Sequence, residues 1–419
     1  MKPSIVAAIG IPLCLLVSCK DESAATKRPS SAAADSSANS TTAAAPISDD
    51  DQAAAIAFGK KFEEAVESQD EDYLRKIFDF ERIIEDSFAG IELPADFRKG
   101  MRHGMQQGRD NAIQNLFASK VHLVEYRSVK GKPGLLFRFR IDGGMDYVEY
   151  QISKSGKKDP EWVISDAYTH SMGSFVSDLL RAMVLPVLAE SDRSLVEKIL
   201  SGNPKSAYIE NVPKISQMMQ LGRNGDPESG KQALEIWKTI PTEVRKAKFA
   251  MVAHIFAQSC LLEDIESAGP YLQAIDELEQ AYPGDPALAL MSIDQNIIRK
   301  DYDGARNAIR TLRKSIPDPY LDFYLGYVDL HAEDYESAET RARTFIEIEP
   351  EDSEGYEMLL ESGFGADQHE VTAEALTKLE ADFDMDFSGA LTAEGFESFI
   401  ASEPGKKWIA QRGLSKRSQ

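Results

Sequence analysis

The chain of 419 residues is long enough for two or three domains, and its 42% hydrophobic and 28% charged residues are typical of globular proteins. The net charge of −22 argues against a nucleic-acid-binding protein, because phosphate recognition requires a basic surface. Only three cysteines occur, two of them among the first 19 residues, so neither a disulfide framework nor a cysteine-rich zinc site is expected. Almost all of the acidic excess lies in residues 261–400.

The chain begins with an apolar run that ends at a cysteine. Lys2 precedes the largely apolar residues Ile5 to Val17, which are too few to cross a hydrocarbon core of about 30 Å as a helix. We therefore interpret residues 1–18 as a signal peptide. No later stretch of the sequence is apolar enough to predict a transmembrane helix.

The motif Leu16-Val17-Ser18-Cys19 resembles the lipobox of bacterial lipoproteins. The resemblance implies that the Cys19 thiol is lipidated, with palmitate among the attached acyl chains, and that cleavage makes Cys19 the first residue. It further implies attachment to the bacterial cell membrane or outer membrane, facing the periplasm or the exterior. An ordinary secretory signal with an incidental cysteine is the alternative.

Residues 19–51 are rich in serine, alanine and threonine and contain no aromatic residue. Such a segment buries too little apolar surface to offset the entropy of ordering it. We predict a disordered linker with a mean reach of roughly 30 Å between the lipid and a folded body.

The pattern of residues 52–170 predicts an α+β domain. Helical periodicity up to about residue 117 gives way to four segments that alternate with period two, joined by short turns rich in glycine and lysine. Short turns predict an antiparallel sheet, in which Phe137 and Phe139 face one way and Arg138 and Arg140 the other. This order of elements resembles the NTF2-like fold, which implies a pocket between the helices and the sheet, catalytic in some members and not in others.

Two residues of this region are candidates for acid–base chemistry. Asp166 and His170 could pair, since a carboxylate and an imidazole together can transfer protons. Nearby tyrosines are Tyr126, Tyr147, Tyr150 and Tyr168. We favour a purely structural role at a strand end for both residues, and Trp162 is expected in the core.

Residues 171–403 return to helical periodicity and contain an internal repeat. Residues 285–317 and 318–350 match at an interval of 33, which indicates stacked helical units. The matching residues resemble the tetratricopeptide (TPR) repeat: Leu325 and Gly326 of the first helix, Ala305 and Ala338 of the second, and the closing Pro317 and Pro350. The family's first-helix tryptophan is absent, and Ala342 and Phe345 reverse the usual large-then-small order. Weaker units precede, around residues 230–241 and 275–283.

Two features of the helical region invite a chemical interpretation. Cys260 shares a helix face with apolar residues, so we expect it to pack in the core and not to act as a nucleophile, and we expect the nearby His254 to point elsewhere on that helix. The segment Asp384 to Gly395 resembles an EF-hand loop, with Asp384, Asp386 and Ser388 at the first ligand positions. It lacks the closing bidentate glutamate, because Gly395 stands there, and we favour an acidic loop without metal.

Taken together, these patterns predict an α+β domain followed by an all-α repeat domain and a basic tail at 404–419. They predict a non-catalytic, membrane-anchored scaffold that needs no cofactor and binds a protein or peptide partner. No P-loop, HExxH, nucleophile-elbow or dinucleotide motif occurs. The acidic excess fits either an ordinary solvated exterior or a field that steers a basic partner. A small-ligand-binding or isomerase-like domain coupled to the repeats is the alternative function.

Overall fold

The computed structural model describes residues 48–91, 93–141, 144–156, 161–181, 184, 206–262, 266–389 and 395–412. The chain divides into two compact units, Met1–Met291 and Ser292–Gln419, and each is described by itself. The first unit therefore contains some of the helices predicted for the second domain. Cys19, the linker up to residue 47 and the tail beyond residue 412 lie outside the described residues.

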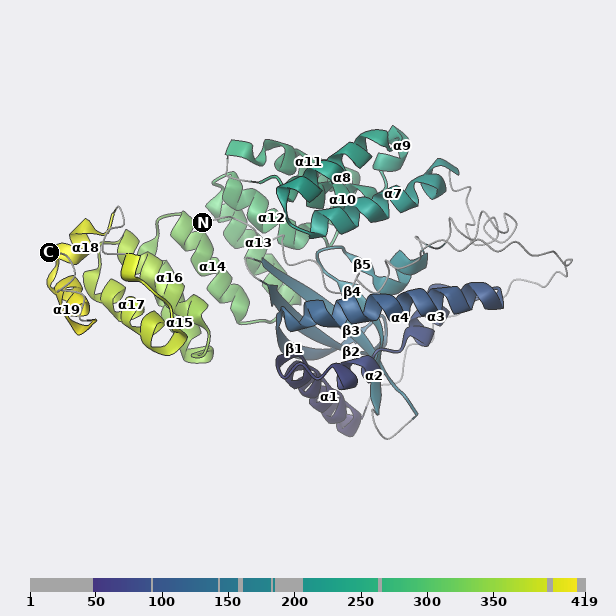
Figure 1. Ribbon diagram of the computed structural model, residues 1–419, viewed down its shortest axis with the longest axis horizontal. Coiled ribbons are helices and arrows are strands. Elements are labelled where there is room, and N and C mark those ends of the chain that lie inside the picture. Colours follow the sequence, from purple (N-terminus) through teal and green to yellow (C-terminus); the bar gives the residue numbers. More distant parts are fainter. Residues whose placement is uncertain are drawn as a thin grey trace, which may run out of the picture. The chain divides into compact units, whose positions relative to one another are not determined.

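The described part of the first unit begins with four helices that lie beside an antiparallel sheet (Figure 1). Three of them begin at capping residues, where a side-chain oxygen of Ser48, Asp70 or Asp79 accepts a hydrogen bond from a first-turn backbone N–H. The four helices are α1 (Asp49–Glu67), α2 (Glu71–Ile77), α3 (Phe80–Ser87) and α4 (Ala95–Phe117).

The sheet has five strands in chain order, each antiparallel to the next. They are β1 (Lys120–Val129), β2 (Lys132–Ile141), β3 (Gly144–Lys154), β4 (Trp162–Thr169) and β5 (Ser174–Phe175). Lys130 and Gly131 form the first hairpin turn with φ of 48° and 76°, the conformation that suits the twist of the flanking strands. The predicted α+β architecture is confirmed, with β5 as an additional short strand.

The two faces of the sheet differ in chemistry. Between the helices and the sheet, aromatic rings fill the core, and Phe62 of α1 lies 5.0 Å from Phe137 and 5.6 Å from Tyr150, measured between ring centroids. On the opposite face, Arg138 and Arg140 are 2% and 6% exposed. The alternation of side chains is therefore as predicted, but both faces are buried.

The helices that the structure describes between residues 206 and 281 pack closely around α10. They are α7 (Ser206–Arg223), α8 (Pro227–Thr239), α9 (Thr242–Arg245), α10 (Lys248–Ser259), the 3-10 turn Glu266–Ala268 and α11 (Gly269–Ala281). Gly222 and Gly230 permit the close approach, because a Cβ added there would lie 2.8 Å from Phe256 Cβ and 2.6 Å from Cys260 Cβ. Lys248 Nζ donates to the Gly173 carbonyl at 2.9 Å and ties α10 to the end of the sheet.

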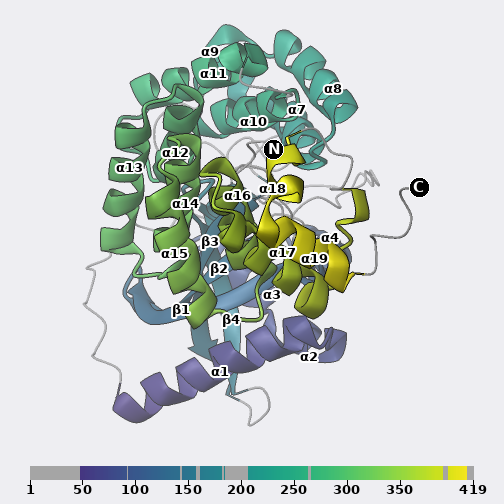
Figure 2. The same cartoon turned by 90° about the vertical axis from the view of Figure 1, so that its left-hand side faces the viewer.

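The second unit is a series of paired helices that stack side by side (Figure 2). After α12 (Leu288–Ile298), which starts in the first unit, come α13 (Tyr302–Ser315), α14 (Tyr320–His331), α15 (Tyr335–Ile348), α16 (Ser353–Gly365) and α17 (His369–Phe383). Lys300, Glu333 and Asp367 each take a left-handed φ of 54–60° just before α13, α15 and α17. Their intervals of 33 and 34 residues confirm a helical repeat and add the pair α16–α17, which the sequence comparison did not identify.

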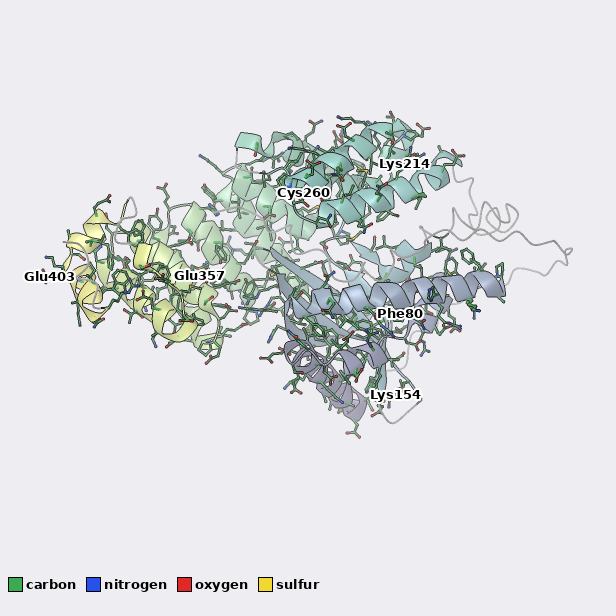
Figure 3. All side chains as sticks on the ribbon, viewed as in Figure 1. Phe80, Lys154, Lys214, Cys260, Glu357 and Glu403 are labelled. Carbon is green, nitrogen blue, oxygen red and sulfur yellow. The ribbon has the colours of Figure 1, made fainter. Side chains whose placement is uncertain are left out.

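Two short helices, α18 (Glu397–Ala401) and α19 (Glu403–Gln411), end the second unit. Glu403 stands in the first turn of α19 (Figure 3), after the capping hydroxyl of Ser402. Trp408 is buried against Phe399, and its Nε1 donates to Glu380 of α17 at 3.1 Å. The basic segment that begins at residue 404 is thus helical and packed up to residue 411. None of the helices in the described ranges is both long and apolar enough to cross a membrane.

Candidate functional site

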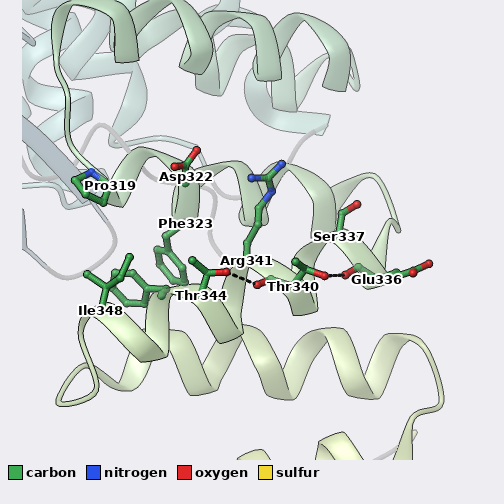
Figure 4. A pocket seen from close by; sticks show the side chains of 10 residues that line it. Pro319, Asp322, Phe323, Glu336, Ser337, Thr340, Arg341, Thr344 and Ile348 are labelled. Carbon is green, nitrogen blue, oxygen red and sulfur yellow. Dashed lines mark hydrogen bonds between the residues drawn. The ribbon is translucent and has the colours of Figure 1, made fainter.

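Helices α14 and α15 line a half-open pocket of about 450 Å³ (Figure 4). Its floor is aromatic, because the rings of Phe323 and Phe345 stack with centroids 4.0 Å apart and an interplanar angle of 21°. Both rings are almost fully buried. The lining residues are Pro319, Asp322, Phe323, Glu336, Ser337, Thr340, Arg341, Thr344, Phe345 and Ile348.

One wall of the pocket is a row of α15 side chains spaced four residues apart, from Glu336 through Thr340 and Thr344 to Ile348. The two threonine hydroxyls donate to the carbonyls four residues earlier, at 3.0 and 2.9 Å, so their oxygens can still accept hydrogen bonds from a ligand. Ile348 ends the row and is 54% exposed, an unusual degree of exposure for a large aliphatic side chain.

Charged side chains fix the other wall. Arg341 Nε donates to Asp329 Oδ2 at 2.7 Å, and Asp329 also accepts from Arg306 Nε of α13 at 2.9 Å. Asp322 pairs with Arg313 of α13. Ion pairs thus hold two of the lining side chains in place, and the pocket has an apolar end for an aliphatic or aromatic side chain and a polar end for hydrogen bonds.

The repeat residues predicted from the sequence occupy equivalent places. Ala305 and Ala338 are fully buried near the starts of α13 and α15. Pro317 and Pro350 follow the ends of the same two helices, where a proline stops further helix. Leu325 is buried on α14, and a Cβ on Gly326 would lie 2.4 Å from Met358 Sδ, so the glycine permits close packing of α14 on α16.

The candidate acid–base pair of Asp166 and His170 does not form, in line with the structural role favoured above. Asp166 instead accepts hydrogen bonds from the backbone N–H and hydroxyl of Ser177, at 3.1 and 2.5 Å. Four residues along a strand span about 13 Å, which places the two side chains too far apart. Asp146 makes the same arrangement with Ser171, so two buried carboxylates hold the segment after β4 against the sheet.

His170 belongs to a different network, on the charged face of the sheet. Its Nε2 lies 2.9 Å from Glu149 Oε1, and Arg127 Nη1 donates to the same oxygen at 2.9 Å. Burial raises the pKa of Glu149, but the hydrogen bond and charge of His170 and of Arg127 outweigh burial, so the net pKa lies below its ordinary value. The rings of Tyr147 and Tyr168 pack edge-on to His170.

The remaining aromatic and thiol candidates are structural. Tyr150 and Trp162 are buried, and Tyr126 is half-buried on β1. Cys260 is buried as predicted, its Sγ donating to the Gly222 carbonyl at 3.1 Å, and burial raises the pKa of the thiol. His254 stacks on Trp237 with ring centroids 4.2 Å apart.

In the EF-hand-like segment, the Asp386 carboxylate is hydrogen-bonded within its own turn. Its carboxylate accepts hydrogen bonds from the backbone N–H and hydroxyl of Ser388 at 2.8 and 2.9 Å, and Arg412 lies 3.6 Å away. Asp384 ends α17 in the left-handed conformation. Residues 390–394 of the loop lie outside the described residues. Within the described ranges, no group of three or more histidine, cysteine, aspartate or glutamate side chains could hold a metal ion.

The chain matches no family model, no curated protein and no solved structure. Sequence reasoning did not identify the pocket, although one signal existed. Ile348 occupies a position where the preceding unit has Ser315, so an aliphatic residue replaces a polar one on an otherwise polar helix face. The exchange marks the pocket's apolar end.

Proposed function

We propose that the protein is a lipid-anchored, non-catalytic lipoprotein of the bacterial cell envelope whose TPR-like helices bind a partner protein. The lipobox ending at Cys19 and the polar linker after it support the anchoring. The helix pairs at intervals of 33 and 34 residues support the TPR-like assignment. The observation that carries the proposed function is the pocket between α14 and α15.

The pocket suits the anchor residue of a protein partner. Burial of one aliphatic or aromatic side chain is worth about 1.5–3 kcal/mol, and interfaces depend on a few such anchors in well-formed pockets. The stacked Phe323 and Phe345 supply the apolar floor, and Ile348 extends it to the surface. The threonine oxygens of the α15 row and the carboxylate of Glu336 can accept hydrogen bonds from the partner's backbone.

In this proposal, the NTF2-like domain is a structural element near the membrane. The space between its helices and its sheet is filled by the rings of Phe62, Phe78, Phe137, Phe139 and Tyr150. A filled interior does not favour a ligand cavity there.

A second candidate, binding of a small ligand or isomerase-like chemistry, is favoured by the network of Arg127, Glu149 and His170 beside two tyrosines. A small molecule that raises the melting temperature of the wild type, but not of His170→Gln, would support it. A screen in which both forms respond alike would count against it.

The test of the main proposal places a photo-crosslinking amino acid at Ile348 in full-length protein in its native cells. We expect one discrete covalent adduct with another protein. The matched control places the same amino acid at Glu347, the exposed neighbour on α15 that does not line the pocket. Equal adducts from both positions, or none from either, would contradict binding at the pocket.

Anchoring is tested separately by fractionating the wild type and Cys19→Ser. We expect the wild type in the membrane fraction, released by detergent alone, and the variant in the soluble fraction. Two forms that both fractionate as soluble protein would contradict the anchor.

A further inference from the structure

Two side chains that line the pocket carry hydrogen-bond donors without a partner among the described residues. Arg341 has five N–H groups, and only the Nε group donates a hydrogen bond there, to Asp329. The hydroxyl of Ser337 makes no hydrogen bond within the described part of the chain. The two residues are four apart on α15 and therefore share a helix face, and Figure 4 shows both side chains projecting from the same side of that helix.

The charge beside these donors is positive. Arg306 and Arg341 both donate to the carboxylate of Asp329, at 2.9 and 2.7 Å, and this side chain is only 2% exposed. One buried negative charge therefore lies between two guanidinium groups. The second partner of Arg306, Asp303, is 99% exposed, so solvent screens its charge. An excess of positive charge thus remains on the wall that Arg341 forms.

The two acidic residues of the lining do not cancel this excess. Asp322 is already paired with Arg313. Glu336 is exposed and forms no ion pair with Arg341 or with any other described residue. The acidic excess of the whole chain acts through solvent, where charges more than about 8 Å apart are largely screened at physiological salt. The donors at the pocket therefore decide which ligand group it accepts.

The donors and the apolar floor are close enough for one short segment to reach both. Arg341 precedes Phe345 by four residues on α15, which corresponds to about 6 Å along the helix axis. An extended segment advances about 3.3 Å per residue, and its side chains at i and i+2 lie on the same face. In a segment that runs along α15, an anchor on the Phe323–Phe345 floor therefore places the side chain two residues away beside Arg341.

We propose that the pocket selects a segment of the partner protein in which one residue separates an aliphatic or aromatic residue from an aspartate or glutamate. The apolar side chain packs on the Phe323–Phe345 floor, and the carboxylate accepts hydrogen bonds from the Arg341 Nη groups and the Ser337 hydroxyl. Guanidinium and carboxylate form paired, charge-assisted hydrogen bonds that are stronger than neutral ones. The occupant follows from charge complementarity. The inference rests on the proposed function, because it specifies the partner of that same pocket.

The test measures fluorescence anisotropy of labelled peptides of about 12 residues binding to the full chain in detergent. Each is a glycine–serine peptide with one central leucine and with glutamate, glutamine or lysine two residues to either side of it. We expect the glutamate peptide to bind about tenfold more tightly than the glutamine peptide, because its hydrogen bonds are charge-assisted. We expect the lysine peptide to bind least. A glutamate peptide with serine in place of leucine should lose binding, since it lacks the anchor.

Two variants remove the donors one at a time. Arg341→Lys keeps a positive charge beside Asp329 but loses the paired Nη groups, and we expect the Kd of the glutamate peptide to rise about fivefold. Ser337→Ala removes a hydroxyl that has no partner in the described chain, so it leaves the described contacts intact. We expect this variant to raise the same Kd about threefold. The Kd of the glutamine peptide should change less in both variants.

Arg343→Lys is the matched control. Arg343 lies two residues further along α15, pairs with Glu339 and Glu374, and does not line the pocket. We expect it to change Kd by less than about twofold. Circular dichroism and melting temperature check the fold of every variant. The proposal would be overturned by an equal loss in Arg343→Lys, by equal binding of the glutamate and glutamine peptides, by tighter binding of the lysine peptide, or by failure of every peptide to bind.

The two proposals fail separately. If the Ile348 adduct forms and the three leucine peptides bind alike, the pocket does not select an acidic residue and the scaffold function stands. If the glutamate peptide binds with the expected variant pattern and no adduct forms at Ile348, the carboxylate site stands and the proposed binding of a partner protein in the cell fails.

Discussion

Asp329 and Arg341 are joined by a hydrogen bond of 2.7 Å, although the Asp329 side chain is only 2% exposed. The same carboxylate accepts from Arg306 at 2.9 Å, so one aspartate of α14 connects α13 and α15. We predict that Asp329→Asn lowers the free energy of unfolding by about 2–3 kcal/mol, because two half-buried arginines lose their charge partner. Urea denaturation followed by circular dichroism measures the loss.

Asp303→Asn is the control for this change. Asp303 also pairs with Arg306, at 3.2 Å, but its side chain is 99% exposed. Exposed ion pairs contribute little to stability, so we expect the urea midpoint of this variant to match the wild type. Equal losses in the two variants would show that burial of Asp329 is not what makes the connection strong.

Gly222 is predicted to resist replacement by alanine. The new Cβ would lie 2.8 Å from Phe256 Cβ and 3.0 Å from the Phe256 carbonyl carbon, so α7 and α10 would have to separate. We expect a net loss of about 1–3 kcal/mol even though alanine is the better helix former. Gly100→Ala on α4 is the comparison, because no atom lies within 4 Å of its added Cβ. Gly100→Ala should raise the free energy of unfolding by about 0.5–1 kcal/mol. Chemical denaturation of both variants measures whether the two changes in stability have opposite signs.

Asp146 gives stability an unusual pH dependence. Burial, opposed by hydrogen bonds from Ser171, raises its pKa from 3.8 to about 6. Between about pH 4 and 6 the folded chain therefore holds this proton more firmly than the unfolded chain, and stability falls as the pH rises. The loss is about 3 kcal/mol, complete above pH 6 and absent below pH 4.

Asp146→Asn should remove this fall, because the amide does not titrate. Urea midpoints at pH 4, 5, 6 and 7 should decline less in the variant than in the wild type. Asp72→Asn, at an exposed position of α2, should keep the wild-type slope. Parallel slopes in the wild type and Asp146→Asn would mean that folding does not raise the pKa of this carboxyl.

His254 gives stability the opposite dependence on pH. Burial lowers its pKa from 6.5 to about 4, with the charge of Glu277 opposing and that of Arg245 assisting the shift. The folded chain keeps the imidazole neutral on Trp237, so stability is lost as the pH falls from about 6.5 to about 4. His254→Phe keeps an aromatic ring there and should lose less stability on acidification, as measured by tryptophan fluorescence in urea. An acid response identical to that of the wild type would refute this.

Local patterns predicted the sheet and the helix pairs because each depends on neighbouring residues. Alternation placed Phe137 and Arg138 on opposite faces, and the helix pairs followed from prolines and small residues at fixed intervals. Alternation does not reveal what covers a face, so the burial of Arg138 was not predictable. The pair α16–α17 escaped notice because the turn between its two helices is defined by a backbone conformation, at Asp367, and not by a characteristic side chain.

The pocket floor coincides with a departure from the TPR sequence pattern. In the sequence, Phe345 stands out only because Ala342 and Phe345 reverse the order of large and small residues typical of TPR repeats. In the structure, the Phe345 ring stacks on Phe323 and forms the pocket floor. The partner of Phe345 lies 22 residues earlier on another helix, so no local pattern could have joined them. The reversed order of Ala342 and Phe345 identified the position, but only the tertiary structure shows that Phe345 forms the pocket floor.

Lys300, Glu333 and Asp367 share one backbone conformation, each at the same point of a helix pair. The chain can therefore be cut after Lys300 and rejoined at Asp334 with matching geometry on both sides of the junction. The repeat is in this sense modular: a whole pair of helices is a unit that gene duplication or deletion can add or remove. Evolution can lengthen or shorten such an array without redesigning its turns.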